Sequence, residues 1–231
     1  VIEFIVILII IPIISGCSYS KEFEKGTLDL LLLSNVKTSD IIQAKLIKLI
    51  VFNSFLVLTT LPLLCIVFSV GGVSVWDMVK YIIVILATTL YFGSFGIYLS
   101  VKYEDSVKAV VRTYLIEIVL TLGIHLLLNI VYNIVDAVNN INFYKGVSGT
   151  YTNIQLENVG TFLIINPMFD LFKLQSDVVG NASSYDVTMN KLGINPVVEK
   201  LWVFISVAIF VIVAMLMVKK TKKILLNKYG K

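Results

Sequence analysis

Apolar residues along the chain gather in five blocks, which polar and glycine-containing segments separate. Four of these blocks reach the roughly 20 residues that an α-helix needs to cross the hydrocarbon core of a bilayer. Several blocks have no polar face, although a helix of a soluble protein needs one. The pattern therefore predicts an all-α, polytopic helical membrane protein, with spans at about residues 1–15, 41–70, 78–101, 107–134 and 197–218.

The first block begins at Val1 and is shorter than the others, because polar residues follow from Ser15 onward. A run of this length is short for a complete membrane span. We therefore expect that a helix upstream is missing from these residues. Five spans here would then correspond to six in the complete domain.

Two connecting segments contain apolar runs that are too short to span a membrane. Residues 18–40 are polar apart from Leu28–Leu33, which predicts a short amphipathic helix at the membrane interface. Residues 135–196 are rich in Asn, Gly, Ser and Asp, and they hold an apolar island at 159–174 that Pro167 interrupts. This island predicts an interfacial or re-entrant helix pair.

The placement of charge predicts the orientation of the spans. Charged residues make up only 15% of the chain and hydrophobic residues 58%, which is more apolar than a typical soluble domain. Fourteen of the 19 Lys and Arg residues lie in residues 15–48, 102–112 and 219–231. Basic residues are enriched in the loops on the cytoplasmic side of a membrane. We therefore expect these segments, including the C-terminal tail, in the cytoplasm, residues 135–196 outside, and the protein in the cell membrane.

Several classes of functional site are not supported by the sequence. The two cysteines, Cys17 and Cys65, form neither a disulfide framework nor a metal-binding pattern. His125 is the only histidine, which excludes a zinc site or an H-E-x-x-H helix within these residues. The sequence has no G-x-x-x-x-G-K-S/T phosphate loop, and no basic stripe with interleaved aromatics. We expect no catalytic residue, metal or cofactor in this chain, and no nucleic-acid partner.

Residues 21–45 carry the pattern on which the functional interpretation depends, KEFEKGTLDLLLLSNVKTSDIIQAK. An acidic and basic stretch leads to Gly-Thr-Leu-Asp, a leucine-rich turn, a Ser/Thr-rich turn and a helix start with Lys45. This segment resembles the cytoplasmic segment of ABC-2-type permeases, the membrane subunits of one class of ATP-driven exporters. Two positions depart from the family pattern, with Phe23 where Arg is frequent and Asn35 where Pro is frequent. The resemblance assigns the coupling to an ATPase to Glu22, Phe23, Glu24, Lys25, Gly26, Thr27, Leu28 and Asp29.

The resemblance implies a permease subunit that exports its substrate by alternating access. The permease would work as a dimer, with a second copy or a homologous permease, and with two ATPase subunits that bind ATP and Mg²⁺. ATP hydrolysis would then take place in the partner. Without the resemblance, the same segment would be interpreted as a solvated loop with an interfacial helix. The alternative function is an ATP-independent membrane transporter or a membrane signalling subunit. Drugs, peptides, lipids, glycans and ions are all compatible substrates.

Polar side chains recur at every fourth residue along the fourth block, and neighbours in such a row touch on a helix surface. Because a helical turn has 3.6 residues, the row drifts by about 40° per step and wraps around the helix. Ionisable groups inside a membrane usually face protein or a water-filled cavity. The row therefore has two interpretations. It faces a translocation path or a subunit interface, or it is a polar ridge that only holds helices together. The row is Thr113, Glu117, Thr121, His125, Asn129 and Asn133, and its candidates for path or interface are Glu117, Thr121, His125 and Asn129.

Overall fold

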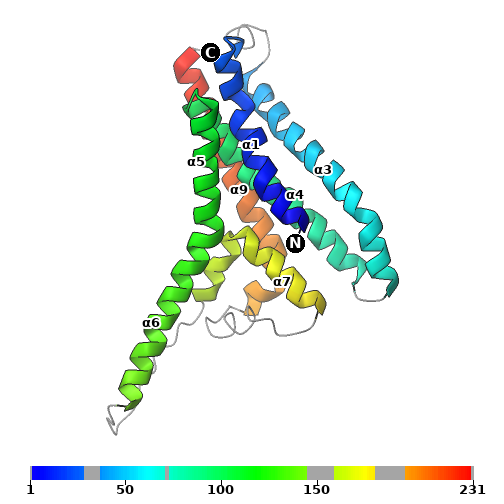
Figure 1. Ribbon diagram of the computed structural model, residues 1–231, viewed down its shortest axis with the longest axis vertical. Coiled ribbons are helices and arrows are strands. Elements are labelled where there is room, and N and C mark those ends of the chain that lie inside the picture. The colour runs from blue at the N-terminus through cyan, green and yellow to red at the C-terminus, as the bar shows by residue number, and fades with distance from the viewer. Residues whose placement is uncertain (1, 29–36, 71–72, 145–158, 180–195, 230–231) are drawn as a thin grey trace.

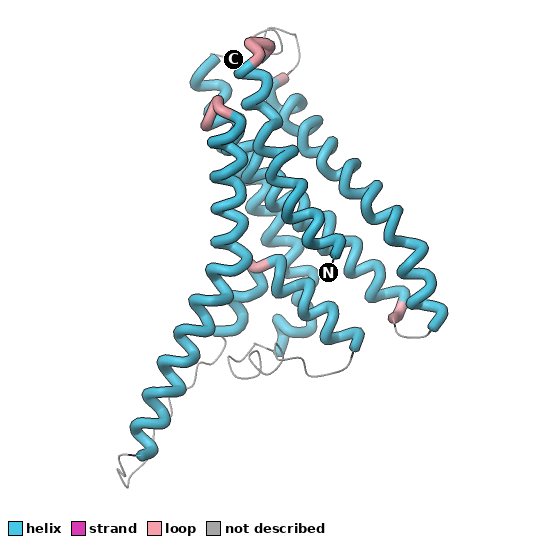
Figure 2. The backbone as a smooth tube through the Cα atoms, viewed as in Figure 1, coloured by secondary structure: helices cyan, strands magenta, loops and turns pink. Residues whose placement is uncertain are grey.

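The computed structural model describes residues 2–28, 37–70, 73–144, 159–179 and 196–229 (Figure 1). Within these ranges the regular elements are all helices (Figure 2). In chain order they are α1 (Ile2–Glu24), α3 (Thr38–Val70), α4 (Val75–Lys102), α5 (Ser106–Ile118), the π-helical turn η1 (Val119–Gly123), α6 (Ile124–Tyr144), the 3-10 helix η2 (Val159–Ile165), α7 (Pro167–Val179) and α9 (Pro196–Tyr229).

Five helices in the described part of the chain are long and apolar enough to cross a membrane. They are α1, α3, α4, the continuous helix formed by α5, η1 and α6, and α9. The predicted all-α, polytopic membrane fold with about five spans is therefore confirmed.

Helix α4 is the centre of the bundle, and α1, α3, α5 and α9 all pack against it. In its most apolar stretch 67% of the residues are buried, against 17% in α3 and 11% in the helix of α5 and α6. Helices α3 and α6 lean away from the bundle in different directions (Figure 1). Their outer faces carry exposed apolar side chains such as Phe55 and Ile130. Such a surface is stable in lipid, which is as apolar as the side chains themselves.

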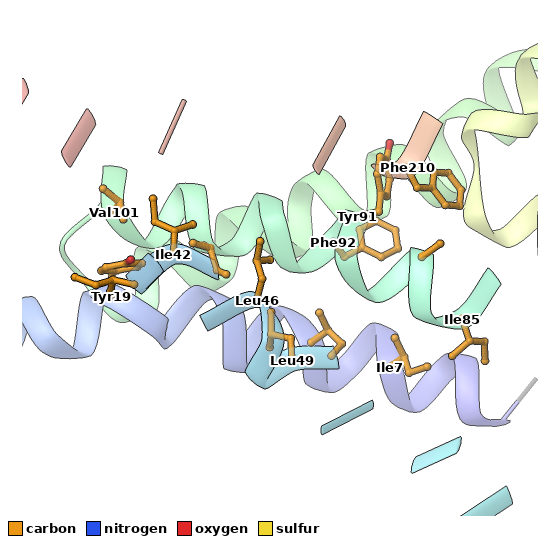
Figure 3. Close-up of a cluster of buried hydrophobic side chains, with 14 of the residues drawn as sticks. Ile7, Tyr19, Ile42, Leu46, Leu49, Ile85, Tyr91, Phe92, Val101 and Phe210 are labelled. Atoms are coloured by element: carbon orange, nitrogen blue, oxygen red, sulfur yellow. The ribbon is translucent and has the colours of Figure 1, made fainter. Parts of the chain in front are cut away.

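A buried apolar cluster joins α1, α3, α4 and α9 (Figure 3). The ring of Tyr91 in α4 lies 4.8 Å from that of Phe210 in α9, measured between centroids. A polar pair is buried in the same bundle, since Asn53 Nδ2 of α3 donates to Thr89 Oγ1 of α4 at 2.6 Å. Such hydrogen bonds between helices hold a bundle together where no water competes for the polar groups.

Helix α1 is longer than the apolar block that predicted it, because it continues through the polar residues 15–24. The hydroxyl of Ser15 donates to the carbonyl oxygen of Ile11 one turn earlier, at 2.6 Å, so this polar side chain is buried with its hydrogen bond made. Its small size also lets α1 approach α4, where a Cβ atom on Gly96 would lie 2.5 Å from Ser15 Cβ. The apolar block is thus the first part of a 23-residue helix, which extends past the predicted end near residue 15.

The apolar island between the fourth and last spans forms the helix pair η2 and α7. The two helices meet at Asn166, and α7 begins with Pro167, a residue well suited to the first helical turn. The aromatic rings of Phe169 and Trp202 lie 6.5 Å apart in a second buried cluster, which includes residues of α4, α6, η2, α7 and α9. The structure therefore has a broken helix pair where the sequence predicts one.

Candidate functional site

The segments that hold most of the basic residues meet at one end of the bundle, called here the basic end. It comprises residues 15–28, 37–48, 102–112 and 219–229, and Figure 1 shows it at the top of the view. The predicted coupling residues 22–29 are called here the coupling segment, and its described part lies at this end, where α1 stops. Three successive residues of that segment each contact a different helix.

Glu22 joins α1 to α3 through Lys45. The ammonium Nζ of Lys45 lies 2.7 Å from Glu22 Oε1 and donates to the carbonyl oxygen of Ser18 at 2.5 Å. The same Nζ lies 4.1 Å from the centroid of the Tyr19 ring, within the range of a cation–π interaction. Only 14% of the Lys45 side chain is exposed, so this ion pair is better shielded from solvent than a surface pair.

Phe23 joins α1 to the C-terminal end of α9. Lys228 Nζ lies 4.7 Å from the centroid of the Phe23 ring and forms an ion pair with Glu104, in the turn between α4 and α5. The face of an aromatic ring attracts a cation, whereas an arginine at position 23 would repel Lys228. The aromatic ring at position 23 is therefore compatible with the lysine near the end of α9.

Glu24 joins α1 to the start of α5. Its Oε1 accepts a hydrogen bond of 2.7 Å from the backbone N–H of Ser106, one of the donors that a helix N-terminus leaves unpaired. Asp105 Oδ1 accepts from the N–H groups of Val107 and Lys108, at 2.9 and 3.1 Å. Hydrogen bonds from the backbone and side chain of Lys108 hold the pKa of Asp105 below its usual value. Carboxylates therefore cap this helix start, where the helix dipole also stabilises negative charge.

Gly26 ends α1 with a reversal of the backbone. Its φ of 66° lies in the left-handed region, which glycine adopts without strain. The N–H of Thr27 donates to the carbonyl oxygen of Glu22, and that of Gly26 to the carbonyl oxygen of Phe23, both at 3.0 Å. This pair of bonds is the Schellman motif, which satisfies carbonyl groups that a helix end otherwise leaves free.

The remaining residues of the coupling segment divide into an exposed and a buried part. Lys25, Gly26 and Thr27 are exposed and form what is called here the tip, whereas Leu28 is 2% exposed. Asp29 lies outside the described residues. The segment thus combines side chains that bind other helices of the same chain with a tip that is free to contact another protein.

The polar row of the fourth span is divided by the π-helical turn. Thr113, Glu117 and Thr121 are buried, and α5 packs against α1 and α4. Both carboxylate oxygens of Glu117 are buried without a hydrogen-bond partner among the described residues. His125 and Asn129 are half-buried and bind each other, since Asn129 Nδ2 lies 3.0 Å from His125 Nε2. The drift expected of a four-residue spacing therefore leads the row from the interior to the outer face.

A family model described as ABC-2 family transporter protein matches residues 2–194, which include the coupling segment and the polar row. The chain belongs to this family. Membership makes it a membrane-spanning permease subunit of an ABC transporter and implies an ATPase partner. The resemblance seen in residues 21–45 is confirmed. No curated protein and no solved structure matches the chain.

Asn166 is a buried polar residue of this ABC-2 family protein that the sequence did not single out. Its Nδ2 donates a hydrogen bond of 2.7 Å to the main-chain carbonyl oxygen of Thr121, in the π-helical turn of the fourth span. Such turns occur often at functional sites within helices. The signal in the sequence was the Asn-Pro pair that interrupts the apolar island.

Asp170 in helix α7 is a second buried polar residue of the permease that the sequence pattern did not indicate. Its side chain is fully buried, and both carboxylate oxygens lack a hydrogen-bond partner in the described part of the chain. Burial raises the pKa of Asp170 well above its usual value, and the nearby Ser206 hydroxyl opposes this rise in part. The raised pKa favours the neutral, protonated form of Asp170 in the folded protein.

Proposed function

We propose that this permease is the membrane subunit of an ATP-driven exporter, and that its coupling segment transmits the movement of a separate ATPase. The ATPase subunits would bind ATP and Mg²⁺ and would contact the exposed tip, Lys25–Thr27. The permease itself would carry the path of the substrate and hydrolyse no ATP.

The observation that carries this proposal is the set of contacts made by Glu22, Phe23 and Glu24. Successive residues of a helix point about 100° apart, so three in a row face three sides of the helix. Here they bind Lys45 of α3, Lys228 of α9 and the Ser106 N–H of α5. A displacement of the tip would therefore move the ends of four spans together, as coupling to an ATPase requires.

Alternating access would follow from this connection. In the structure α3 and α6 lean away from the centre of the bundle, whereas the ends of α1, α3, α5 and α9 are joined at the basic end (Figure 1). Movement of the joined ends would change the tilt of the outer helices. We propose that a second permease, either another copy or a homologue, completes the path between two such bundles.

The test is reconstitution of the permease with its ATPase in vesicles, with ATP hydrolysis and export measured together. A charge reversal at the tip, Lys25→Glu, is expected to weaken copurification of the ATPase. The variant Glu24→Gln is expected to retain the ATPase but to reduce the export per ATP hydrolysed, because it weakens the tie to α5. The matched control is Asp77→Asn, which alters the ion pair with Lys80 at the start of α4. Export without an ATPase would instead establish the alternative, an ATP-independent transporter.

The proposal also requires that the basic end face the cytoplasm of a cell whose cytoplasmic membrane holds the protein. Its excess of Lys and Arg supports this orientation. A membrane-impermeant maleimide is expected to label Lys25→Cys only in inside-out vesicles, and Ser74→Cys only in right-side-out vesicles. The reverse pattern would contradict the orientation.

A further inference from the structure

A groove with a cavity of about 610 Å³ lies between α1 and α3 at the basic end. Its walls are helical stripes, in which residues three or four positions apart face the cavity. Ile13, Ile14 and Leu49 provide apolar side chains to the groove, and the exposed Lys21 and Lys48 provide cationic ones. The groove therefore combines apolar and cationic side chains, and its volume is within the range of ligand sites in proteins.

The charges of this groove are not balanced among the described residues. Lys21, Lys45 and Lys48 line it together with one carboxylate, that of Glu22. Glu22 Oε1 pairs with Lys45, and this pair is fixed further by Ser18 and Tyr19. Lys21 and Lys48 form no ion pair with any described residue. Two positive charges are thus available to an anion from outside the chain.

The position of Lys48 points to an anion that belongs to the membrane. Lys48 lies ten residues after the start of α3 at Thr38, which is about 15 Å along the helix. Its neighbours Ile47 and Val51 are 56% and 48% exposed on the outer face of the span, where an apolar surface meets lipid. A lysine among lipid-facing residues is costly without a counter-charge, and the phosphates of lipid headgroups supply one at this depth.

We propose that this groove binds an anionic glycerophospholipid from the leaflet at the basic end. The phosphate lies between Lys21 and Lys48, and an acyl chain follows Ile13 and Leu49. The second carboxylate oxygen of Glu22, Oε2, is buried without a hydrogen-bond partner in the described residues. A hydroxyl group of the headgroup donates to this oxygen, and for this reason phosphatidylglycerol is the probe of choice.

The affinity of the site is measured by native mass spectrometry of the full chain in detergent, titrated with phosphatidylglycerol or phosphatidylcholine of equal acyl chains. We expect phosphatidylglycerol to bind more tightly. Lys21→Gln and Lys48→Gln are each expected to weaken its binding about fivefold, as for one basic residue at an anionic surface. The matched control is Lys25→Gln with Lys222→Gln, two exposed lysines outside the groove at the same end. Equal binding of the two lipids, or an equal loss in the control, would overturn the proposal.

The thiol of Cys17, which lines the groove, locates the bound lipid, and the exposed Cys65 serves as an internal reference. In phosphatidylcholine vesicles, added phosphatidylglycerol is expected to slow the reaction of Cys17 with a membrane-permeant maleimide and to leave Cys65 unchanged. Protection by inorganic phosphate alone, with the same dependence on Lys21 and Lys48, would show a site for a soluble anion instead. That result would refute the lipid site.

Discussion

The side-chain amide of Asn166 donates a hydrogen bond of 2.7 Å to the main-chain carbonyl oxygen of Thr121, 45 residues earlier in the chain. Thr121 lies in η1, where the hydrogen bonds of the fourth span change from the α-helical to the π-helical pattern. Asn166 also caps α7, because its Oδ1 accepts from the N–H of Met168 at 2.9 Å. One side chain thus connects the bulge of a span to the helix pair beside it.

Replacement of Asn166 is expected to destabilise this connection. Asn166→Ser retains a hydroxyl that can cap α7 but is too short to reach Thr121. It should lower the free energy of unfolding by about 1–3 kcal/mol, because a buried carbonyl group loses its partner. Asn166→Ala should cost about 1 kcal/mol more, since the cap is lost as well. Thermal unfolding in detergent, followed by the fluorescence of the buried Trp202, measures both, and the exposed Asn133→Ala is the control. Wild-type stability of Asn166→Ser would contradict the expectation.

Close packing of α1 on α4 depends on the absence of a side chain at Gly96. A Cβ atom there would overlap Ser15 Oγ and lie 2.5 Å from Ser15 Cβ. We expect Gly96→Ala to lower the free energy of unfolding by about 1–3 kcal/mol, as overpacking does in other cores. Gly123→Ala is the matched control, because its Cβ would lie no closer than 3.6 Å to Val119. Equal melting temperatures for the two variants would refute the packing argument.

The backbone reversal at Gly26 requires a residue that tolerates a positive φ. Gly26→Ala is expected to cost about 1–2 kcal/mol in the left-handed region, although a Cβ there would touch nothing. Gly26→Asn should cost less, because asparagine visits this region more readily. In the reconstituted complex the alanine variant should also bind the ATPase less well, since the tip changes direction. If Gly26→Ala copurified as much ATPase as Gly26→Asn or more, the conformation of this turn would not determine binding of the ATPase.

The stability of the permease is expected to depend on pH through Asp170. The carboxyl group titrates near pH 4 in the unfolded chain, whereas burial raises its pKa in the folded protein. A raised folded-state pKa gives stability that is complete below about pH 4 and is lost as the pH rises toward the folded pKa. One proton contributes up to about 1.4 kcal/mol per pH unit across that window. Asp170→Asn should remove this dependence and be the more stable protein at pH 7. Parallel curves of melting temperature against pH for the two proteins would contradict this prediction.

The helices of this protein were predictable because hydropathy is a local property. About 20 consecutive apolar residues predict a span, whatever residues surround them. The end of α1 was missed in this way, because its last turns contain the small residues Ser15, Gly16 and Ser20, which interrupt the apolar run. The hydroxyl groups of Ser15 and Ser20 donate to the helix backbone, and the small size of all three residues favours contact between helices.

The candidate site was predictable only as a segment. The pattern of residues 21–45 indicated the family and a set of candidate coupling residues, but it did not separate side chains that bind within the chain from the exposed tip. That division depends on which helices surround the end of α1. The lone Asn-Pro pair at Asn166 likewise indicated a break between helices, and its bond to Thr121 was not visible in sequence.

The all-α membrane fold, the approximate positions of the spans and the ABC-2 family are encoded in neighbouring residues, so they were predictable from the amino-acid sequence. The contacts of Glu22, Phe23 and Glu24 with three different helices became visible only in the folded protein. The same holds for Lys21 and Lys48, which line the groove between α1 and α3 without an ion pair to any described residue. A contact between distant residues is set by the packing of whole helices, and no local pattern of polar and apolar positions specifies it.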